Sequence, residues 1–425
     1  MTEIKGSVTT AVCYAETIDE TAIEQIRRMC SYPLTENAKV RIMPDVHAGK
    51  GCTIGTTMTI TDRACPNVVG VDIGCGMYTV KLAGGTPDFP AVDDVCHFIP
   101  SGTHVWEGRT EKFDLTALKC YRSLKDTRRL ERSLGTLGGG NHFIEIGKAS
   151  DGTYYLVIHS GSRNLGKQVA EIYQQIAVDL QSGKEGYFRK KEEIISSFKA
   201  EGRRAEIQGA LKALKKEYAG KVPEVPEDLC WLYGSFLDDY LHDVEICQRF
   251  AVRNREKMAE ILLGKTGMRA TESFHTIHNY IDTEERILRK GAIAAHKGEK
   301  VLIPVNMRDG SVIAVGKGNP EWNYSAPHGA GRILSRTQAK ETLSLDAYKQ
   351  AMAGIYTTSV NENTIDEAPM AYKSLDEIVG IIRDSVDIVD IMKPVYNFKA
   401  SGGDPTRKEE GAKLSEEADT DDMAN

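Results

Sequence analysis

The sequence predicts an α+β fold in which glycine-rich strands form the core of one domain and a block of helices is inserted into it. Glycine and β-branched residues dominate residues 1 to about 165, and strand-like sequence returns from 274 to about 336. Between them, from about 167 to 263, charged and apolar residues alternate at helical spacing. Because the strand-like parts flank the helical block, we expect a single domain of residues 1–400 with a helical insertion.

The first strand-like part is punctuated by glycines. Its clearest segments are 53–60 (TIGTTMTI) and 68–76 (VVGVDIGCG). We expect both to be strands joined to their neighbours by tight glycine turns.

The helical block is clearest at 188–195 and 210–216, and two prolines, Pro223 and Pro226, are expected to break it. A helical pattern also covers 374–391. Residues 401–425 are small, polar and acidic, which predicts a disordered tail.

The overall composition is that of a soluble globular protein, with 41% hydrophobic and 27% charged residues. No apolar run reaches the roughly 18 residues of a membrane helix, and no signal peptide is recognisable, so we expect no membrane segment. The nine cysteines are odd in number and irregularly spaced. This pattern is typical of a reducing compartment, and the expected location is the cytoplasm.

The net charge of −7 argues against a generic polyanion binder. Residues 401–425 contribute −5 of it, which leaves the body nearly neutral at −2. A local basic groove for nucleic acid is therefore compatible with the composition.

Asp72 and Cys75 lie three residues apart in a glycine-punctuated turn, so both side chains can face one centre. A buried cysteine beside a turn-capping aspartate is the structural alternative for this pair. Three further histidines stand among glycines, small residues or β-branched residues: His142 after Asn141, His159 at the end of a strand-like run, and His278.

A single histidine in such a setting more often has a structural role than binds a metal. The occurrence of five candidate ligands together makes a purely structural role less favoured for the whole set. One aspartate, one cysteine and three histidines exceed the three or four protein ligands of a single zinc site. The surplus fits two metal ions that share a thiolate at Cys75, an arrangement suited to phosphoryl chemistry. Ligand softness alone favours zinc.

His328 follows a proline and precedes glycines and Arg332, in the segment 325–332 (SAPHGAGR). Glycines let a backbone approach a phosphate closely, and an arginine can neutralise one. The imidazole could be a metal ligand, a general acid or a nucleophile, and its glycine-lined setting favours direct contact with phosphorus.

Two lysine-bearing segments could also balance phosphate charge: 289–292 (RKGA), and 394–399 with Lys399. For a lone lysine, a solvated surface position is the safer interpretation. The segment 44–51 (PDVHAGKG) lacks the spacing and the closing Ser/Thr of a P-loop, and no Rossmann fingerprint is present.

Six segments resemble, in order, the motifs of the RtcB family of RNA-splicing ligases. They are 44–47 (PDVH), 71–76 (VDIGCG), 140–143 (GNHF), 159–163 (HSGSR), 278–279 (HN) and 328–332 (HGAGR). Six colinear motifs make the resemblance specific, and it extends from about residue 43 to 399.

The resemblance implies an RtcB-like fold and a GTP- and manganese-dependent RNA ligase. Such an enzyme joins an RNA 3′-phosphate or 2′,3′-cyclic phosphate end to a 5′-hydroxyl end. His328 would attack the α-phosphate of GTP and carry GMP as a phosphoramidate. Two Mn²⁺ ions, bridged by Cys75, would be held by Asp72, Cys75, His142, His159 and His278. The expected nucleotide-binding residues are Asn141, His142, Glu145, His278, Asn279, Asn306, His328, Gly329, Ala330, Gly331 and Lys399.

The chain departs from the family pattern in two places. Residues 304–307 read Pro-Val-Asn-Met where the family usually has Pro-Gly-Ser-Met, so Asn306 would stand in for the serine. The 26 residues after Lys399 also extend past the family's usual end. Both features suggest a divergent branch, so the expected role is tRNA splicing or RNA repair, and the need for an accessory protein is left open.

Two other function classes compete with the ligase. A metal-dependent RNA phosphodiesterase or cyclic-phosphate hydrolase would use His328 as a general acid. A non-catalytic RNA-binding protein would leave the ligand set unexplained.

Overall fold

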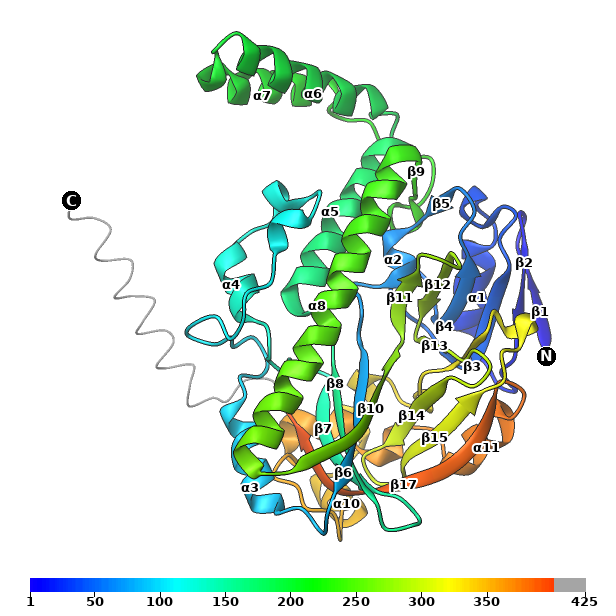
Figure 1. The fold of residues 1–425 in the computed structure, drawn as a ribbon. Coiled ribbons are helices and arrows are strands. Elements are labelled where there is room, and N and C mark those ends of the chain that lie inside the picture. Colours follow the sequence, from blue (N-terminus) through cyan, green and yellow to red (C-terminus); the bar gives the residue numbers. More distant parts are fainter. Residues whose placement is uncertain (401–425) are drawn as a thin grey trace.

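The computed structural model describes residues 1–400, and its mixed helix and strand content confirms the predicted α+β class (Figure 1). The predicted tail, 401–425, lies outside the described residues. The division into one domain with a helical insertion stays a prediction.

A six-stranded sheet contains the N-terminal strands. All neighbouring strands are antiparallel except β2 and β3. In spatial order the strands are β1 (Thr2–Lys5), β2 (Thr10–Cys13), β3 (Val40–His47), β4 (Ile54–Thr59), β12 (Ile287–Lys290) and β11 (Asn279–Asp282).

A seven-stranded antiparallel sheet forms the second layer of strands. Its register places His159 opposite both Met77 and Phe143, and Phe143 opposite Lys399, so these residues share one end of the sheet. In spatial order the strands are β10 (Arg269–Ile277), β6 (Gly76–Ala83), β8 (Tyr154–Ser160), β7 (Phe143–Lys148), β17 (Val386–Lys399), β15 (Gly310–Gly316) and β14 (Lys300–Asn306).

Two short antiparallel pairs complete the strands. β13 (Ala292–Ala294) pairs with β16 (Ser325–Pro327), which holds His328 beside the end of the six-stranded sheet. β5 (Arg63–Ala64) pairs with β9 (Leu232–Tyr233).

Four helices occupy the predicted helical block. Helices α5 (Arg163–Gln181) and α8 (Gly234–Thr266) lie along the body, whereas α6 (Glu185–Ala200) and α7 (Ile207–Glu217) project from it as a hairpin (Figure 1). The other α-helices are α1 (Glu20–Met29), α2 (Pro66–Val69), α3 (Phe89–Phe98), α4 (Thr127–Arg132), α9 (Arg336–Thr342), α10 (Leu345–Ala351) and α11 (Leu375–Ile382). Short 3₁₀ turns are η1 (Pro33–Thr35), η2 (Leu115–Ala117), η3 (Tyr121–Ser123), η4 (Arg204–Glu206), η5 (Glu227–Leu229), η6 (Pro320–Trp322), η7 (Glu362–Glu367) and η8 (Pro369–Ala371). Among residues 1–400, no helix has the length and apolar character needed to cross a membrane.

Helix α8 joins two hydrophobic cores. Its first two-thirds pack in a cluster with the six-stranded sheet, through residues such as Val244 and Phe250. Its last third packs in a cluster with the seven-stranded sheet, through Met258 and Leu262. Two polar residues, Asn254 and Arg255, are fully buried at the junction between these cores. The candidate site lies at this junction.

The strand predicted for 68–76 is wrong. Pro66 opens the one-turn helix α2, and the chain then turns through Gly70 and Gly74, with φ of 101° and 77°, so that the strand begins only at Gly76. Positive φ at two glycines breaks a strand ladder and favours a turn. The helices α1 and α3 were also missed, although Asp19 and Asp88 give each of them an N-cap.

The helix predicted for 374–391 is right only in its first half. Helix α11 ends at Ile382, and β17 begins at Val386 and pairs with both β15 and β7. Val386, Ile388 and Asp390 are less exposed than Asp387 and Val389, as in a strand, but apolar and polar residues do not alternate in the sequence of 386–391. The strands with which β17 pairs lie far away in the sequence. Tertiary pairing therefore overrode the local helical spacing.

Candidate active site

Thirteen of the fourteen predicted site residues line one cavity of about 300 Å³. The exception, His142, contacts the Asp72 carboxylate and the Cys75 thiol from beside it. The structure thus brings together the predicted residues, while their individual roles stay predictions. The lining residues are Asp72, Cys75, Asn141, Glu145, His159, His278, Asn279, Asn306, His328, Gly329, Ala330, Gly331 and Lys399.

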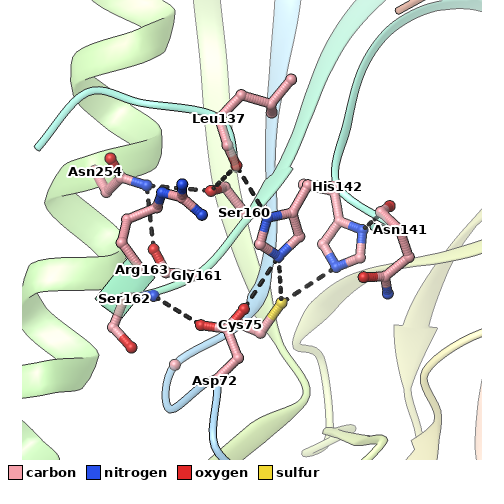
Figure 2. Close-up of polar contacts among 12 residues, drawn as sticks. Asp72, Cys75, Leu137, Asn141, His142, Ser160, Gly161, Ser162, Arg163 and Asn254 are labelled. Carbon is pink, nitrogen blue, oxygen red and sulfur yellow. Dashed lines mark hydrogen bonds and ion pairs between the residues drawn. The ribbon is translucent and has the colours of Figure 1, made fainter. Parts of the chain in front are cut away.

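The five predicted metal ligands form a continuous cluster, of which Figure 2 labels Asp72, Cys75 and His142. Cys75 Sγ lies 3.4 Å from Nε2 of both His142 and His159. His142 Nε2 also lies 3.0 Å from Asp72 Oδ2, and His159 Nε2 lies 3.4 Å from His278 Nε2. Every ligand atom therefore has another ligand atom as its neighbour.

Backbone carbonyls orient two of the imidazoles. His142 Nδ1 lies 2.9 Å from Leu137 O, and His159 Nδ1 lies 3.1 Å from Asn141 O (Figure 2). A neutral imidazole that donates from Nδ1 has a bare lone pair on Nε2. For His159 this leaves Nε2 as an acceptor that faces the cluster, which is the arrangement of metal-bound histidines. His142 Nε2 instead lies at hydrogen-bond distance from the Asp72 carboxylate. His278 Nδ1 is buried without a hydrogen-bond partner among residues 1–400.

Burial determines the charge state of the cluster. Burial lowers the pKa of His159 and His278 well below the usual value, and the neighbouring imidazoles lower it further. Burial opposes ionisation of Asp72, but hydrogen bonding and attraction to His142 hold the pKa of Asp72 below its usual range. Neutral imidazoles beside a carboxylate are the protonation state that binds a cation.

Helix α8 supports the loops that carry the ligands, and sequence reasoning missed this contribution. Arg255 Nη1 donates to Gly74 O and Ser160 O, each at 2.7 Å, next to Cys75 and His159. Asn254 Nδ2 donates to Gly161 O (Figure 2), and its Oδ1 accepts from the Gly135 amide. Asn254 and Arg255 are polar residues within the mostly apolar, buried face of α8. Polar residues at such positions were the sequence signal that could have revealed this support.

His328 is held by Asp45, which belongs to the motif at residues 44–47. The sequence alone did not reveal this role of Asp45. Asp45 is fully buried, and its Oδ2 accepts from both the His328 backbone amide at 3.1 Å and His328 Nδ1 at 2.6 Å. Donation from Nδ1 leaves the lone pair on Nε2 of His328, as a nucleophile requires. The His328 ring lies 4.9 Å from the His278 ring between centroids, so it borders the ligand cluster.

A buried carboxylate, Glu367, forms ion pairs with three basic side chains at another wall of the cavity. Its oxygens lie 2.6 Å from Lys399 Nζ, 2.8 Å from Arg336 Nη1 and 3.3 Å from Arg332 Nη1. Burial opposes its ionisation, but attraction to Lys399 and Arg336 lowers the pKa of Glu367 to about 2. The solvated-surface interpretation of Lys399 is therefore wrong: the side chain is buried in the cavity wall. The wall carries more positive than negative charge.

Glu145 is a buried carboxylic acid with an unfilled hydrogen-bonding position. Its Oε2 accepts from Asn397 Nδ2 at 2.8 Å, whereas Glu145 Oε1 and Asn397 Oδ1 are buried and find no donor within residues 1–400. Burial raises the pKa of Glu145 to about 7, against the opposing influence of Asn397 and Lys399. Two acceptor oxygens facing the cavity suit a ligand that presents N–H donors.

The structure accommodates the departure at residues 304–307. Val305 is buried in β14 without positive φ, so the backbone does not need a glycine there. The Asn306 amide is engaged within its own turn, where it accepts from the Arg308 and Asp309 amides and donates to the Asp309 carboxylate.

The segment 289–292 does not supply phosphate-binding cations. Lys290 Nζ donates to the carbonyls of Lys50, Cys52 and Asn67, and Arg289 donates to Ser325 and neighbouring groups. Both side chains are buried and committed to the fold.

Comparison with known proteins finds one family model that matches most of the chain, and relatives named for RNA and tRNA splicing. The family model described as "tRNA-splicing ligase RtcB" matches residues 25–118 and 107–400. The chain is 31% identical to the RNA-splicing ligase RtcB of Escherichia coli strain K12, over 85% of this chain and 90% of that protein. It is 28% identical to the tRNA-splicing ligase RtcB of Aeropyrum pernix, over 80% of this chain and 83% of that protein.

Gly161→Ala should weaken metal binding without removing a ligand. A Cβ at this position would lie 2.1 Å from Asp72 Oδ1, so the carboxylate must move. We expect a loss of about 10–100-fold in Mn²⁺ affinity, the range for disturbed ligand supports. Equilibrium dialysis with elemental analysis measures it. Gly85→Ala, where a Cβ meets nothing within 4 Å, is the matched control. Unchanged affinity in Gly161→Ala would remove Asp72 from the metal site.

Glu145→Gln should become more stable, relative to the unaltered protein, as pH rises. The folded state raises the pKa of Glu145 from 4.5 to about 7, so ionisation above pH 4.5 costs the fold stability, and the full cost is present above pH 7. We expect a relative gain of up to about 3 kcal/mol between pH 5 and pH 8. Thermal unfolding of both metal-free proteins at the two pH values measures it. A pH-independent difference would contradict the raised pKa.

Proposed function

This chain belongs to the RtcB family, and from that premise we propose that it is an RNA ligase that uses GTP and Mn²⁺. It would join RNA 3′-phosphate or 2′,3′-cyclic phosphate ends to 5′-hydroxyl ends through a guanylyl-histidine intermediate. The observation that carries the proposal is the position of His328: its Nδ1 is held by Asp45 beside the ligand cluster.

The donor set fits two divalent ions. One thiol, one carboxylate and three inward-facing imidazole nitrogens are more ligands than one tetrahedral site uses. Cys75 Sγ, which lies 3.4 Å from two imidazole nitrogens, is the candidate bridging ligand. When bound, the ions would polarise the phosphate oxygens and offset their negative charge.

His328 would perform the first covalent step. Its Nε2 attacks the α-phosphorus of GTP, a P–N bond forms, and the P–O bond to the leaving pyrophosphate breaks. The imidazole carries positive charge as the bond forms, and the fully buried Asp45 carboxylate stabilises that charge through Nδ1–H. The buried hydrogen bond also prevents the ring from turning its other nitrogen to the nucleotide.

The RNA would then be activated and joined. An oxygen of the RNA 3′-phosphate attacks the guanylyl phosphorus, which breaks the P–N bond and frees His328. The product is an anhydride between the RNA 3′-phosphate and GMP. The 5′-hydroxyl of the second RNA end attacks the RNA phosphorus, a phosphodiester forms, and GMP leaves. A 2′,3′-cyclic phosphate end must first be opened by water to the 3′-phosphate.

The cavity walls offer complementary groups for the nucleotide. The acceptor oxygens of Glu145 and Asn397 lack donors, and the edge of guanine presents N–H groups. The cations Lys399, Arg332 and Arg336 around Glu367 would bring positive potential to the bound phosphates. The glycine-containing segment 329–331 would let the backbone approach them closely.

We place the activity in RNA repair or tRNA splicing in the cytoplasm. Relatives in the family are named for RNA and tRNA splicing. All nine cysteines lie in the described part of the chain, and each is a free buried thiol, which supports a reducing compartment.

His328→Ala should abolish covalent labelling by GTP radiolabelled at the α-phosphate while bound Mn²⁺ stays near the unaltered level. His328 is the nucleophile in the proposal and is not among the five ligands. Autoradiography after denaturation and elemental analysis measure the two quantities. His97→Ala, whose side chain is 59% exposed outside the cavity, is the control. A wild-type protein that stays unlabelled but hydrolyses cyclic phosphates would favour the hydrolase alternative.

Asp45→Asn should slow guanylylation without releasing metal. Asparagine can hold the ring but provides no negative charge to stabilise the imidazolium, and the change of an orienting aspartate can cost up to about 10⁴-fold. Single-turnover labelling at saturating GTP measures the rate. An unchanged rate would remove Asp45 from the mechanism.

A further inference from the structure

The hairpin of α6 and α7, hereafter the arm (residues 185–217), contributes little to the core. Figure 1 shows it projecting from the end of the molecule where α5 ends and α8 begins. Helix α6 has no buried residue, and α7 buries only Leu214. At its base Phe188 contacts Phe236 of α8, with ring centroids 5.0 Å apart. The arm is therefore a surface extension with its own small apolar seam.

The arm is basic on an acidic protein, because residues 185–217 contain nine basic and six acidic residues. Residues 199–216 contain six basic and two acidic residues, whereas the whole chain has a net charge of −7. Arg203 pairs with both acidic residues, Glu201 and Glu206. The other five cations are exposed and form no ion pair within residues 1–400: Lys199, Arg204, Lys212, Lys215 and Lys216.

Three of these lysines share one face of α7. Ile207, Leu211 and Leu214 form the seam of the arm at helical spacing, and Lys212, Lys215 and Lys216 occupy the remaining surface at spacings of three and four. Like charges at these spacings repel and destabilise a helix. Lys215 and Lys216 lie in the last turn of α7, where the helix dipole stabilises cations. The exposed cluster thus offers three positive charges on one surface to a polyanion.

The arm stands at a defined distance from the ligand cluster. Helix α5 begins at Arg163, four residues after His159, and its 19 residues span about 28 Å before the arm begins. A nucleic acid strand that advances about 3.4 Å per nucleotide needs roughly eight steps to cover this length. A short oligonucleotide in the cavity cannot reach the arm, whereas a longer RNA can.

We propose that the arm binds the phosphate backbone of the RNA substrate at a distance from its reacting end. This inference rests on the proposed function, which makes RNA the substrate of this chain. Lysine contacts to phosphate strengthen binding and position the RNA without reading its sequence. The arm thereby gives a net acidic protein a local attraction for a polyanion.

The test compares Lys212→Gln/Lys215→Gln/Lys216→Gln with a control triple, Lys5→Gln/Lys119→Gln/Lys349→Gln, which makes the same charge change at exposed sites elsewhere. Two RNAs with 3′-phosphate ends are used: a stem-loop of about 20 base pairs, and an oligonucleotide of about four nucleotides that is shorter than the span of α5. Fluorescence anisotropy gives the Kd of each at several salt concentrations. Labelling by GTP is measured in parallel.

The arm triple should bind the stem-loop about 10- to 100-fold more weakly at 0.1 M salt, and the slope of log K against log salt should fall by about 2–3. Binding of the short RNA and labelling by GTP should stay unchanged, and the control triple should lose less than the arm triple for the stem-loop. An unchanged salt slope, an equal loss in the control triple, or an equal loss for both RNAs would overturn the proposal.

The labelling by GTP tests the proposed function independently of RNA binding. If the proposed function is wrong, the unaltered protein will not be labelled by GTP. The binding comparison needs no covalent chemistry, so it still decides whether the arm holds RNA.

Discussion

The structure around the cavity depends on the convergence of five ligand atoms on one centre. Nε2 of His142 and of His159 both lie 3.4 Å from Cys75 Sγ, and a third imidazole lies equally close to His159. Burial raises the pKa of the Cys75 thiol well above its usual value, so without a cation the sulfur has one proton to share between two imidazoles. The surrounding structure holds them there: carbonyls of residues 137 and 141 bind the outer ring nitrogens, and Arg255 of α8 ties the two loops together. Zinc and manganese can both use these ligands, and softness favours zinc, so activity rather than affinity must distinguish them.

The charges around the cavity are arranged by burial. The imidazoles of His159 and His278 are kept neutral by desolvation, whereas Glu367 is kept ionised by the cations against it. Asp45 is fully buried, and one of its carboxylate oxygens accepts hydrogen bonds from both the ring and the backbone amide of His328. Neutral imidazoles, a histidine fixed by a carboxylate and a cationic wall thus occupy different sides of one cavity. In the proposed function, this separation would let metal, histidine and phosphate meet without neutralising one another beforehand.

The sequence was most informative where a short, glycine-rich segment contains a side chain that can bind metal or phosphate. The glycine-rich segments around Asp72, His142 and His328 predicted residues that the fold brings into a single cavity. It was least informative about partners that come from distant segments. Nothing near Lys399 reveals Glu367, and nothing near His328 reveals that Asp45 orients its ring. The strand predicted for 68–76 failed because glycine with positive φ turns the chain where composition alone suggests a strand.

Anomalous diffraction at the manganese absorption edge, from crystals grown with Mn²⁺, tests the central claim most directly. The account predicts anomalous density inside the cavity, bounded by Cys75 Sγ and the Nε2 atoms of His142, His159 and His278. Residues 1–400 hold one other group of candidate ligands, Asp282, Glu285 and His296, which lies outside the cavity. Anomalous density only at that group, or none in the cavity at saturating Mn²⁺, would contradict the account.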